Sequence, residues 1–193
     1  MGTDFSFRQR AVNTLTEECG CYALCDLDHV PIYVGRANDE IQSRVHRHLI
    51  TGRSHAAANR QFDVWEIAWV WAYPVAEREQ IDALEYALIK EFDYRSPLMN
   101  GSRPRDPDSP IDVPKPAQIV QVMQDQEIAE RRDLSSRFPR QIEHYSNLIS
   151  HFLTVKNSNE IALVAQAHFA RLRRLHSRLL DLAIEVEFDP GDD

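Results

Sequence analysis

Apolar and polar positions follow a strand-like pattern near the start of the chain and a helical pattern further on. Residues 20–26 and 31–35 are two apolar runs with a short polar break between them, which predicts a β-hairpin. Residues 39–50 repeat apolar side chains every four positions, which predicts a helix. Residues 62–73 are rich in aromatic and β-branched side chains and predict a long central strand, and residues 76–92 predict a second helix.

The second half of the chain begins with a clear change in composition. Six of the ten prolines fall between Pro97 and Pro116, which predicts a linker or an extended arm. From Ala117 onward the apolar spacing is helical and predicts two or three helices in a hairpin or small bundle. We therefore divide the chain into a first domain at 1–101 with a core at about 18–101, a linker at 102–116, and a helical region with an acidic tail at 117–193.

The overall composition narrows the class of protein. The chain has 193 residues, 43% hydrophobic and 27% charged, which is typical of a globular protein. No apolar run reaches the roughly 20 residues that a membrane-spanning helix needs. The first ten residues include Asp4 and lack the apolar stretch of a secretory signal, so we expect a cytoplasmic protein without a membrane partner.

Three cysteines, Cys19, Cys21 and Cys25, lie within seven positions. An odd number argues against a disulfide framework. With His29 they could supply four zinc ligands, but their spacing is unlike that of common zinc sites. Because they alternate along an expected strand, we favour small buried thiols.

Charge is distributed unevenly. The net charge of −8 is unusual for a protein that binds DNA, but residues 36–60 contain five arginines against two acidic residues. This window is a candidate DNA-binding face, with an ordinary solvated helix and loop as the alternative. The candidate DNA-binding residues are Arg36, Arg44, Arg47, Arg53 and Arg60. A second basic stretch at 171–178 could contact a nucleic-acid backbone, although a solvated helix face is the simpler interpretation.

Several side chains in the first domain suit the hydrolysis of a phosphodiester, which needs an activated water and positive charge near the phosphate oxygens. Tyr22 closes the run Gly20-Cys21-Tyr22, and Tyr33 opens Tyr33-Val34-Gly35. Arg44 can hold a phosphate oxygen, and His48 one helical turn later can exchange a proton.

Two further residues complete the candidate catalytic set. Glu85 lies beside the apolar stripe of the second expected helix and could hold a hard divalent cation such as Mg²⁺. Asn100 follows a proline-containing turn. Each of the six residues has an ordinary structural explanation when taken singly, so the argument rests on their joint order and spacing.

That joint pattern resembles the GIY-YIG nuclease family over about residues 18–101. The resemblance implies an α/β fold of the α+β kind, with a small, three-stranded, mainly antiparallel sheet flanked by helices. Cys21 and Val34 replace the middle isoleucines of the two tripeptides, and both are apolar packing positions. The family positions match Tyr22, Tyr33, Arg44, His48, Glu85 and Asn100.

The resemblance implies a metal-dependent DNA endonuclease. Tyr22 would act as general base on water with help from His48, Tyr33 would order the water network, and Glu85 would hold one Mg²⁺ or Mn²⁺. The Arg-x-x-x-His pair is similar to that of restriction-type members, which favours double-stranded DNA in a restriction, defence or mobile-element setting. The alternatives are a structure-specific repair or recombination nuclease and a non-catalytic module that binds nucleic acid or protein.

The resemblance does not extend to the C-terminal helices, which we expect to pack on the first domain or to make a homodimer.

Overall fold

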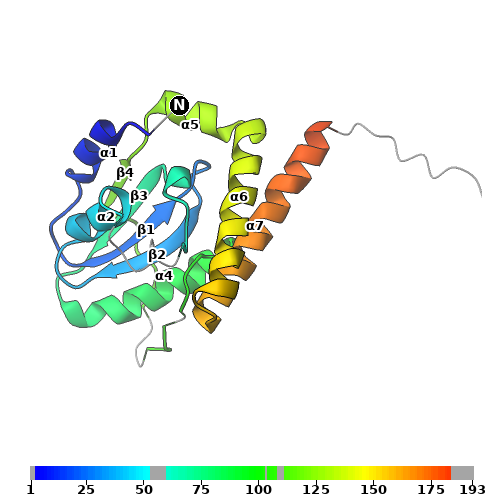
Figure 1. Ribbon diagram of the computed structural model, residues 1–193. Helices are drawn as coiled ribbons and strands as arrows, with labels where there is room; N and C mark the ends of the chain where they lie inside the picture. Colours follow the sequence, from blue (N-terminus) through cyan, green and yellow to red (C-terminus); the bar gives the residue numbers. More distant parts are fainter. Residues whose placement is uncertain (1–2, 53–59, 103, 108–110, 184–193) are drawn as a thin grey trace, which may run out of the picture.

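The computed structural model describes residues 3–52, 60–102, 104–107 and 111–183 (Figure 1). It has the mixed α/β architecture predicted from the sequence, with helices around one antiparallel sheet. In chain order the elements are α1 (Phe5–Val12), β1 (Gly20–Cys25), β2 (Pro31–Ala37), α2 (Ile41–Leu49), the 3₁₀ turn η1 (Val64–Glu66), β3 (Trp69–Pro74), the 3₁₀ turn η2 (Arg78–Gln80), α4 (Ile81–Arg95), β4 (Gln118–Gln121), α5 (Asp125–Arg132), α6 (Leu134–Thr154) and α7 (Asn159–Ala183).

The sheet has the strand order β2-β1-β3-β4, and all neighbouring strands are antiparallel. The predicted hairpin is therefore confirmed as β1 and β2. Tyr22 of β1 lies opposite Gly35 of β2 on one side and opposite Ala72 of β3 on the other. This register brings the two tyrosine-containing tripeptides next to each other, one on β1 and the other on the edge strand β2.

The sheet has four strands where the sequence predicted three. Residues 118–121 form β4, although the sequence pattern predicted a helix from Ala117 onward. The Ala117 N–H donates to the Ala72 carbonyl at 2.9 Å, and Ile119 pairs with Trp71. The free edge of β3 and the β-branched Ile119 and Val120 favour a strand here, and only tertiary pairing reveals it.

The third strand is shorter than predicted. Its first half, residues 62–68, contains η1, because the Asp63 carboxylate accepts the Trp65 N–H at 3.1 Å and starts a turn. The regular strand β3 begins only at Trp69. The second helix also begins later than predicted, at Ile81, after η2.

One face of the sheet packs against helices from both halves of the chain. Tyr22 and Leu24 belong to the same buried cluster as Val45 of α2, Leu148 of α6 and Ile161 of α7. The C-terminal helices therefore share the core of the first domain. This shared core fixes the first turn of α7 relative to the sheet.

The opposite face packs against α4 and carries the cysteines. Cys21 and Cys25 are free thiols that pack with Leu84 and Leu88, and burial raises the pKa of both thiols. His29 points elsewhere: its Nε2 accepts a hydrogen bond from the Trp71 indole at 2.9 Å. These contacts agree with the interpretation of the cysteines as small buried side chains.

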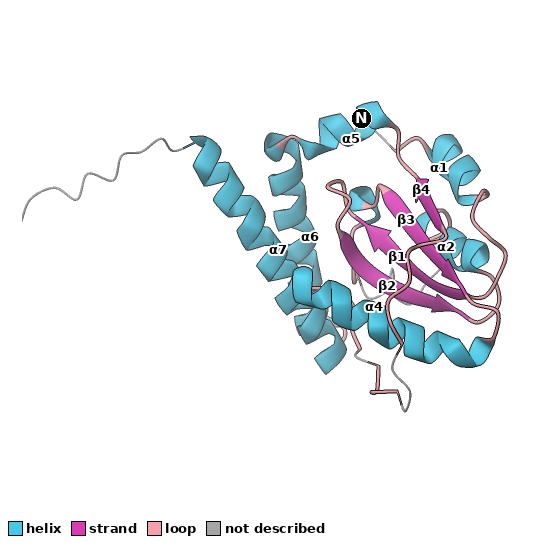
Figure 2. Cartoon of the chain, turned by 180° about the vertical axis from the view of Figure 1, so that it is seen from behind, coloured by secondary structure: helices cyan, strands magenta, loops and turns pink. Residues whose placement is uncertain are grey.

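Helices α6 and α7 lie side by side as an antiparallel hairpin at one end of the sheet (Figures 1 and 2). Arg137 of α6 is buried and donates two hydrogen bonds of 2.9 Å to the Glu66 carboxylate and one of 2.5 Å to Asp28. Burial raises the pKa of Glu66, and the Arg137 charge opposes that rise.

None of the described helices combines the length and apolar character that crossing a membrane requires.

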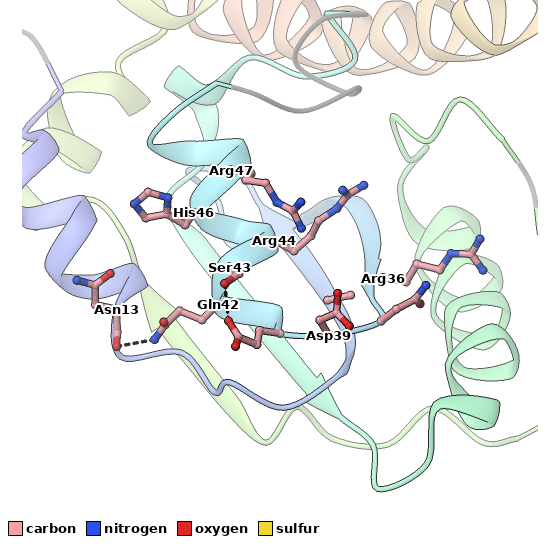
Figure 3. A pocket seen from close by; sticks show the side chains of 11 residues that line it. Asn13, Arg36, Asp39, Gln42, Ser43, Arg44, His46 and Arg47 are labelled. Atoms are coloured by element: carbon pink, nitrogen blue, oxygen red, sulfur yellow. Dashed lines mark hydrogen bonds between the residues drawn. The ribbon is translucent and has the colours of Figure 1, made fainter.

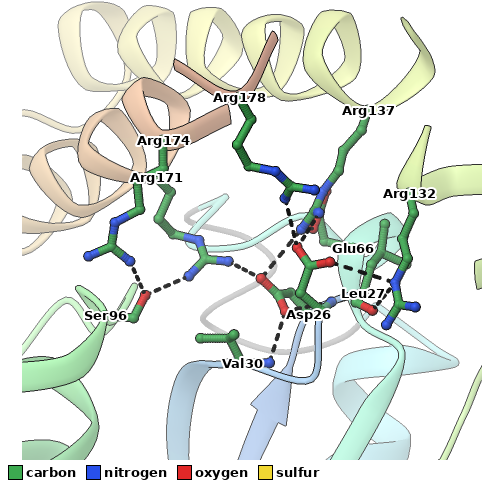
Figure 4. Close-up of polar contacts among 11 residues, drawn as sticks. Asp26, Leu27, Val30, Glu66, Ser96, Arg132, Arg137, Arg171, Arg174 and Arg178 are labelled. Carbon is green, nitrogen blue, oxygen red and sulfur yellow. Dashed lines mark hydrogen bonds and ion pairs between the residues drawn. The ribbon is translucent and has the colours of Figure 1, made fainter. Parts of the chain in front are cut away.

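The second basic stretch also belongs to this contact. Arg171 of α7 pairs with Asp26 and donates to the Ser96 hydroxyl at 3.0 Å, and Arg174 donates to the same hydroxyl at 3.1 Å (Figure 4). Arg173 is exposed. Most of this stretch therefore joins α7 to the first domain, which neither the solvated-face nor the DNA-contact interpretation predicted.

Candidate active site

A small polar cavity of about 130 Å³ lies between the edge of the sheet, α2, α4 and α7. It brings together four of the six predicted catalytic residues: Tyr33, Arg44, Glu85 and Asn100. The other residues that line it are Gln61, Gly101, Ser102 and Glu160.

Tyr22 and His48 form a buried pair next to this cavity. The Tyr22 hydroxyl and the His48 Nε2 are 2.6 Å apart, and both side chains are almost fully excluded from solvent. Burial raises the pKa of Tyr22 well above its usual value, and the nearby Arg44 opposes the shift. Burial lowers the pKa of His48 to about 4, with further lowering by Arg44 and Arg47, so the imidazole is neutral at neutral pH.

The glycine of the second tripeptide makes room for this pair. A Cβ on Gly35 would lie 2.3 Å from both the Cζ and the hydroxyl oxygen of Tyr22. Atoms cannot approach so closely, so any side chain at this position must displace the phenol. Gly35 therefore lets the Tyr22 ring lie directly on the backbone of β2.

Tyr33 and Arg44 face the cavity itself. The Tyr33 ring lies 5.1 Å from Phe62 and 5.7 Å from His48, measured between ring centroids. Burial raises the pKa of Tyr33 to about 12, while Arg44 opposes the rise. Among the described residues, none hydrogen-bonds the buried Nε of Arg44. The guanidinium thus retains a free donor beside the cavity, suited to an anionic oxygen.

Glu85 brings a carboxylate to the same cavity. Its side chain is 17% exposed, and its Oε2 lies 3.8 Å from the Arg36 Nε. Burial raises the pKa of Glu85, Arg36 lowers it, and Asp82 raises it further. A partly buried carboxylate whose ion pair with Arg36 is long is a group that a cation would stabilise.

The donor set of the cavity fits a hard divalent cation. Its potential ligands are oxygen atoms, from the carboxylates Glu85 and Glu160 and the hydroxyl of Ser102, which Mg²⁺ and Mn²⁺ prefer. Within the described parts of the chain, no three or more His, Cys, Asp or Glu side chains are grouped to hold a metal. The cavity therefore fits an ion held by one or two carboxylates and otherwise by water.

Asn100 acts on the backbone of β2. Its Nδ2 donates to the Val34 carbonyl at 2.7 Å, and its Oδ1 accepts the Val34 N–H at 3.0 Å. The neighbouring Met99 N–H donates to the Ile32 carbonyl at 2.7 Å. The 99–100 segment thus pairs with the free edge of β2 and fixes the strand that carries Tyr33 and Gly35.

The predicted DNA-binding arginines have different surroundings. Arg44 and Arg47 of α2, with Arg36, line a larger surface cavity of about 870 Å³ (Figure 3). Arg36 is half-exposed and forms an ion pair with Asp82. Arg60 is exposed, has a left-handed backbone with φ of 54°, and its carbonyl oxygen lies 3.2 Å from the His144 Nε2. Arg53 lies outside the described residues.

Three cavities adjoin at the site. The small cavity shares Arg44 with the 870 Å³ cavity, and it shares Glu85 and Ser102 with a third of about 530 Å³ along α4. The outer two cavities share Arg36. Together they form an open polar surface whose lining includes Tyr33, Arg44, Glu85 and Asn100, four of the six candidate catalytic residues.

Sequence reasoning missed four residues of the small cavity: Gln61, Gly101, Ser102 and Glu160. Gly101 and Ser102 directly follow Asn100, and this adjacency is the only feature of the sequence that points to them as site residues. Gln61 and Glu160 reach the cavity only through tertiary packing, and no local spacing points to them.

Residues 18–96 match the family model described as the GIY-YIG catalytic domain. The match confirms the predicted family for this part of the chain, which includes Tyr22, Tyr33, Arg44, His48 and Glu85. None of the curated proteins matches the chain. The family supports a nuclease of the GIY-YIG type, and the matched segment ends before α5, α6 and α7.

Proposed function

We propose that the chain, through its GIY-YIG catalytic domain, is a metal-dependent endonuclease that hydrolyses phosphodiester bonds in double-stranded DNA. One observation carries the proposal: a phenol, a guanidinium and a carboxylate share a cavity of about 130 Å³ beside a hydrogen-bonded Tyr–His pair. These are the groups that hydrolysis of a phosphodiester needs for proton transfer, for charge stabilisation and for holding a cation.

Arg44 is the proposed phosphate ligand. Its guanidinium stays charged at any working pH, its planar fork matches phosphate oxygens, and its Nε has no hydrogen-bond partner among the described residues. A phosphate bound here would also offset the positive charge that helps to lower the pKa of His48. His48 would then accept a proton more readily than it does without substrate.

Tyr22 and His48 are the proposed proton acceptors. As water attacks phosphorus, its proton passes to the Tyr22 oxygen while the Tyr22 proton passes to the His48 Nε2, across the 2.6 Å contact. Burial keeps the Tyr22 phenol protonated at neutral pH, so it can accept a proton only if it gives up its own at the same time, and this coupled transfer avoids a free phenolate. Tyr22 exposes no surface and does not line the cavity, so the side chains around the pair would have to move when substrate binds before the Tyr22 hydroxyl could meet the attacking water, which Tyr33 would orient.

Glu85 would hold the cation, Mg²⁺ or Mn²⁺. When bound, such an ion supplies positive charge near the leaving oxygen and the phosphate. The chain's own contribution is to keep Glu85 ionised at the cavity, and Arg36 favours this by lowering the pKa that burial raises.

The open surface beside the cavity supports a nucleic-acid substrate. Arg36, Arg44 and Arg47 line the 870 Å³ cavity, where they can contact successive phosphates along a strand. The Arg44–His48 pair is similar to that of restriction-type members of the family, and this resemblance supports a restriction, defence or mobile-element setting and double-stranded DNA. Asp39 and Glu40 also line this cavity, so the charge of its lining is only weakly positive, and this local positive charge is compatible with the net charge of −8 of the whole chain.

Two further parts of the proposal concern the protein as a whole. Helices α6 and α7 expose Ile142, Leu153 and Phe169, which supports a homodimer through this hairpin. Sedimentation at several protein concentrations tests this, and a monomer at all of them would exclude it. The three free cysteines support a reducing compartment such as the cytoplasm.

Incubation with supercoiled plasmid tests the activity. We expect nicked or linear product with Mg²⁺ or Mn²⁺, none with EDTA, and a loss of about 10³-fold in Arg44→Gln, the scale seen for a guanidinium on a transferring phosphoryl group. The control Arg95→Gln removes an exposed arginine that pairs with Glu91 away from the cavity, and it should keep full activity.

The choice of substrate decides between the alternatives. Cuts at a fixed sequence would support the restriction setting, and cleavage confined to branched DNA would support the repair nuclease. Wild-type protein that is inert on duplex, single-stranded and branched DNA would refute the proposal and leave a binding module.

A further inference from the structure

Glu160 is the one residue of the catalytic cavity that comes from the C-terminal helical hairpin. It lies in the first turn of α7, and it lines the same cavity as Tyr33, Arg44 and Glu85. The segment that matches the GIY-YIG catalytic domain ends at residue 96, so Glu160 lies well outside it. We propose that Glu160 is the second carboxylate of the cation site and holds the water shell of an ion whose direct ligand is Glu85.

The inference rests on the proposed function, because it assigns a residue to the cation of that reaction. It adds that the C-terminal hairpin is part of the active site. The hairpin would supply the second carboxylate of a cation site whose other residues come from the first domain.

Packing fixes the position of Glu160. A Cβ on Gly101 would lie 3.2 Å from the Glu160 Cβ and 3.4 Å from its carbonyl oxygen, so α7 lies against the backbone next to Asn100. The adjacent Ile161 and the later Val164 are fully buried in the core that contains Tyr22. The first turn of α7 is therefore held in place from two sides, which is the support that a ligating side chain needs.

The two carboxylates differ in a way that suits direct and water-mediated contact. The Glu85 side chain is 17% exposed, whereas that of Glu160 is 47% exposed. Mg²⁺ keeps several of its waters and binds one or two protein carboxylates. A cavity of about 130 Å³ has room for an ion with part of its water shell between the two groups.

The contacts of Glu160 leave it available for this role. Its carboxylate is paired with Lys156 at 3.3 Å, four residues earlier, and both side chains are partly exposed. Surface pairs of this kind contribute little stability, so a divalent cation can compete with the lysine. Alternatively, Glu160 takes no part in binding the cation, and its negative charge only repels the phosphate of the substrate. Neutralising Glu160 should weaken cation binding in the first role and speed up cleavage in the second.

Calorimetric titration with Mn²⁺ alone tests the inference on the full chain. We expect Glu160→Gln to weaken Mn²⁺ binding by about tenfold, the lower end of the effect of losing an outer-shell ligand partner, and Glu85→Gln to weaken it further. Lys156→Ala keeps the Glu160 carboxylate and removes the ammonium group that competes with the cation for it, so this variant should bind Mn²⁺ at least as tightly as wild type. The control Asp181→Asn removes an exposed charge from the other end of the same helix, about 30 Å away, and should change nothing.

Plasmid cleavage by the same proteins distinguishes a failure of the proposed function from a failure of the inference about Glu160. Wild type that neither binds Mn²⁺ nor cleaves DNA would overturn the proposed function and this inference together. Wild type that does both, with Glu160→Gln binding Mn²⁺ as tightly as wild type, would overturn the inference alone. Faster cleavage by Glu160→Gln at unchanged Mn²⁺ affinity would also overturn the inference, because Glu160 would then only repel the phosphate of the substrate. Thermal melting checks that each variant is folded.

Discussion

Replacement of Gly35 by alanine tests the packing on which the Tyr22–His48 pair depends. A Cβ at this position would overlap the Cζ and the hydroxyl oxygen of Tyr22 at 2.3 Å, and the ring is buried on all sides. The phenol must therefore move, and its 2.6 Å contact with His48 must lengthen or break. The backbone at Gly35 is outside the left-handed region, so steric overlap is the main cause of the effect.

The expected magnitude combines two opposing contributions. Overpacking a close-packed core lowers the free energy of unfolding by about 1–3 kcal/mol. A glycine-to-alanine change at an unstrained position raises it by about 0.4–1 kcal/mol through the unfolded chain. We expect Gly35→Ala to be less stable than wild type by about 1–2 kcal/mol, and to cleave DNA more slowly because the proton acceptor is displaced.

A double-mutant cycle isolates the cause. Tyr22→Leu removes the ring atoms that the new methyl group would meet, so in this background Gly35→Ala should no longer destabilise and should gain a few tenths of a kcal/mol. Urea unfolding of the four proteins at pH 7 gives all the required free energies. An equal loss of stability from Gly35→Ala in both backgrounds would refute the steric explanation.

Three further predictions concern other contacts of the fold and the site. Arg137→Met should lower the free energy of unfolding by about 3–5 kcal/mol at neutral pH, because Glu66 is left buried and charged. Since burial already raises the pKa of Glu66, this loss should shrink in acid as the carboxyl takes up a proton, which urea unfolding at several pH values would show. His48 has a pKa near 4 when folded and an ordinary value near 6.5 when unfolded, so stability should fall as the pH drops from 6.5 to 4. His48→Gln should flatten that slope by up to about 1.4 kcal/mol per pH unit, and an unchanged slope would contradict the buried neutral imidazole. Asn100→Ala should lose about 1–2 kcal/mol through its two bonds to Val34 and slow cleavage, yet leave Mn²⁺ affinity unchanged in calorimetry.

The residues that the sequence could predict are those in short, regular patterns. Tyr22 and Tyr33 lie in apolar runs that form adjacent strands, and Arg44 and His48 are one turn apart on a helix with a clear apolar stripe. Local patterns of this kind fix which face a side chain occupies, and the family resemblance supplied the roles. The match over residues 18–96 confirms the family for this region.

The features that the sequence could not predict depend on contacts between distant segments. Strand β4 exists because the chain returns to the open edge of β3, and its four residues carry no strong strand pattern of their own. Glu160 reaches the cavity because α7 packs on the core through Ile161. The carboxylate partners of Arg137 are Glu66 in η1 and Asp28 in the turn after β1, about 70 and 110 residues earlier, at spacings that no sequence rule relates.

The rate of single-turnover cleavage of a labelled DNA duplex in Mn²⁺ tests the central claim most directly, when Glu85→Gln is compared with Glu79→Gln. Both variants lose one negative charge, but Glu85 lines the catalytic cavity whereas Glu79 is an exposed residue of η2 outside it. We predict a loss of about 10²–10³-fold for Glu85→Gln, equivalent to about 3–4 kcal/mol of transition-state stabilisation, and a rate within about twofold of wild type for Glu79→Gln. A Glu85→Gln protein that cleaves as fast as the Glu79→Gln control would contradict the account, because the cavity would then not be where the phosphodiester is hydrolysed.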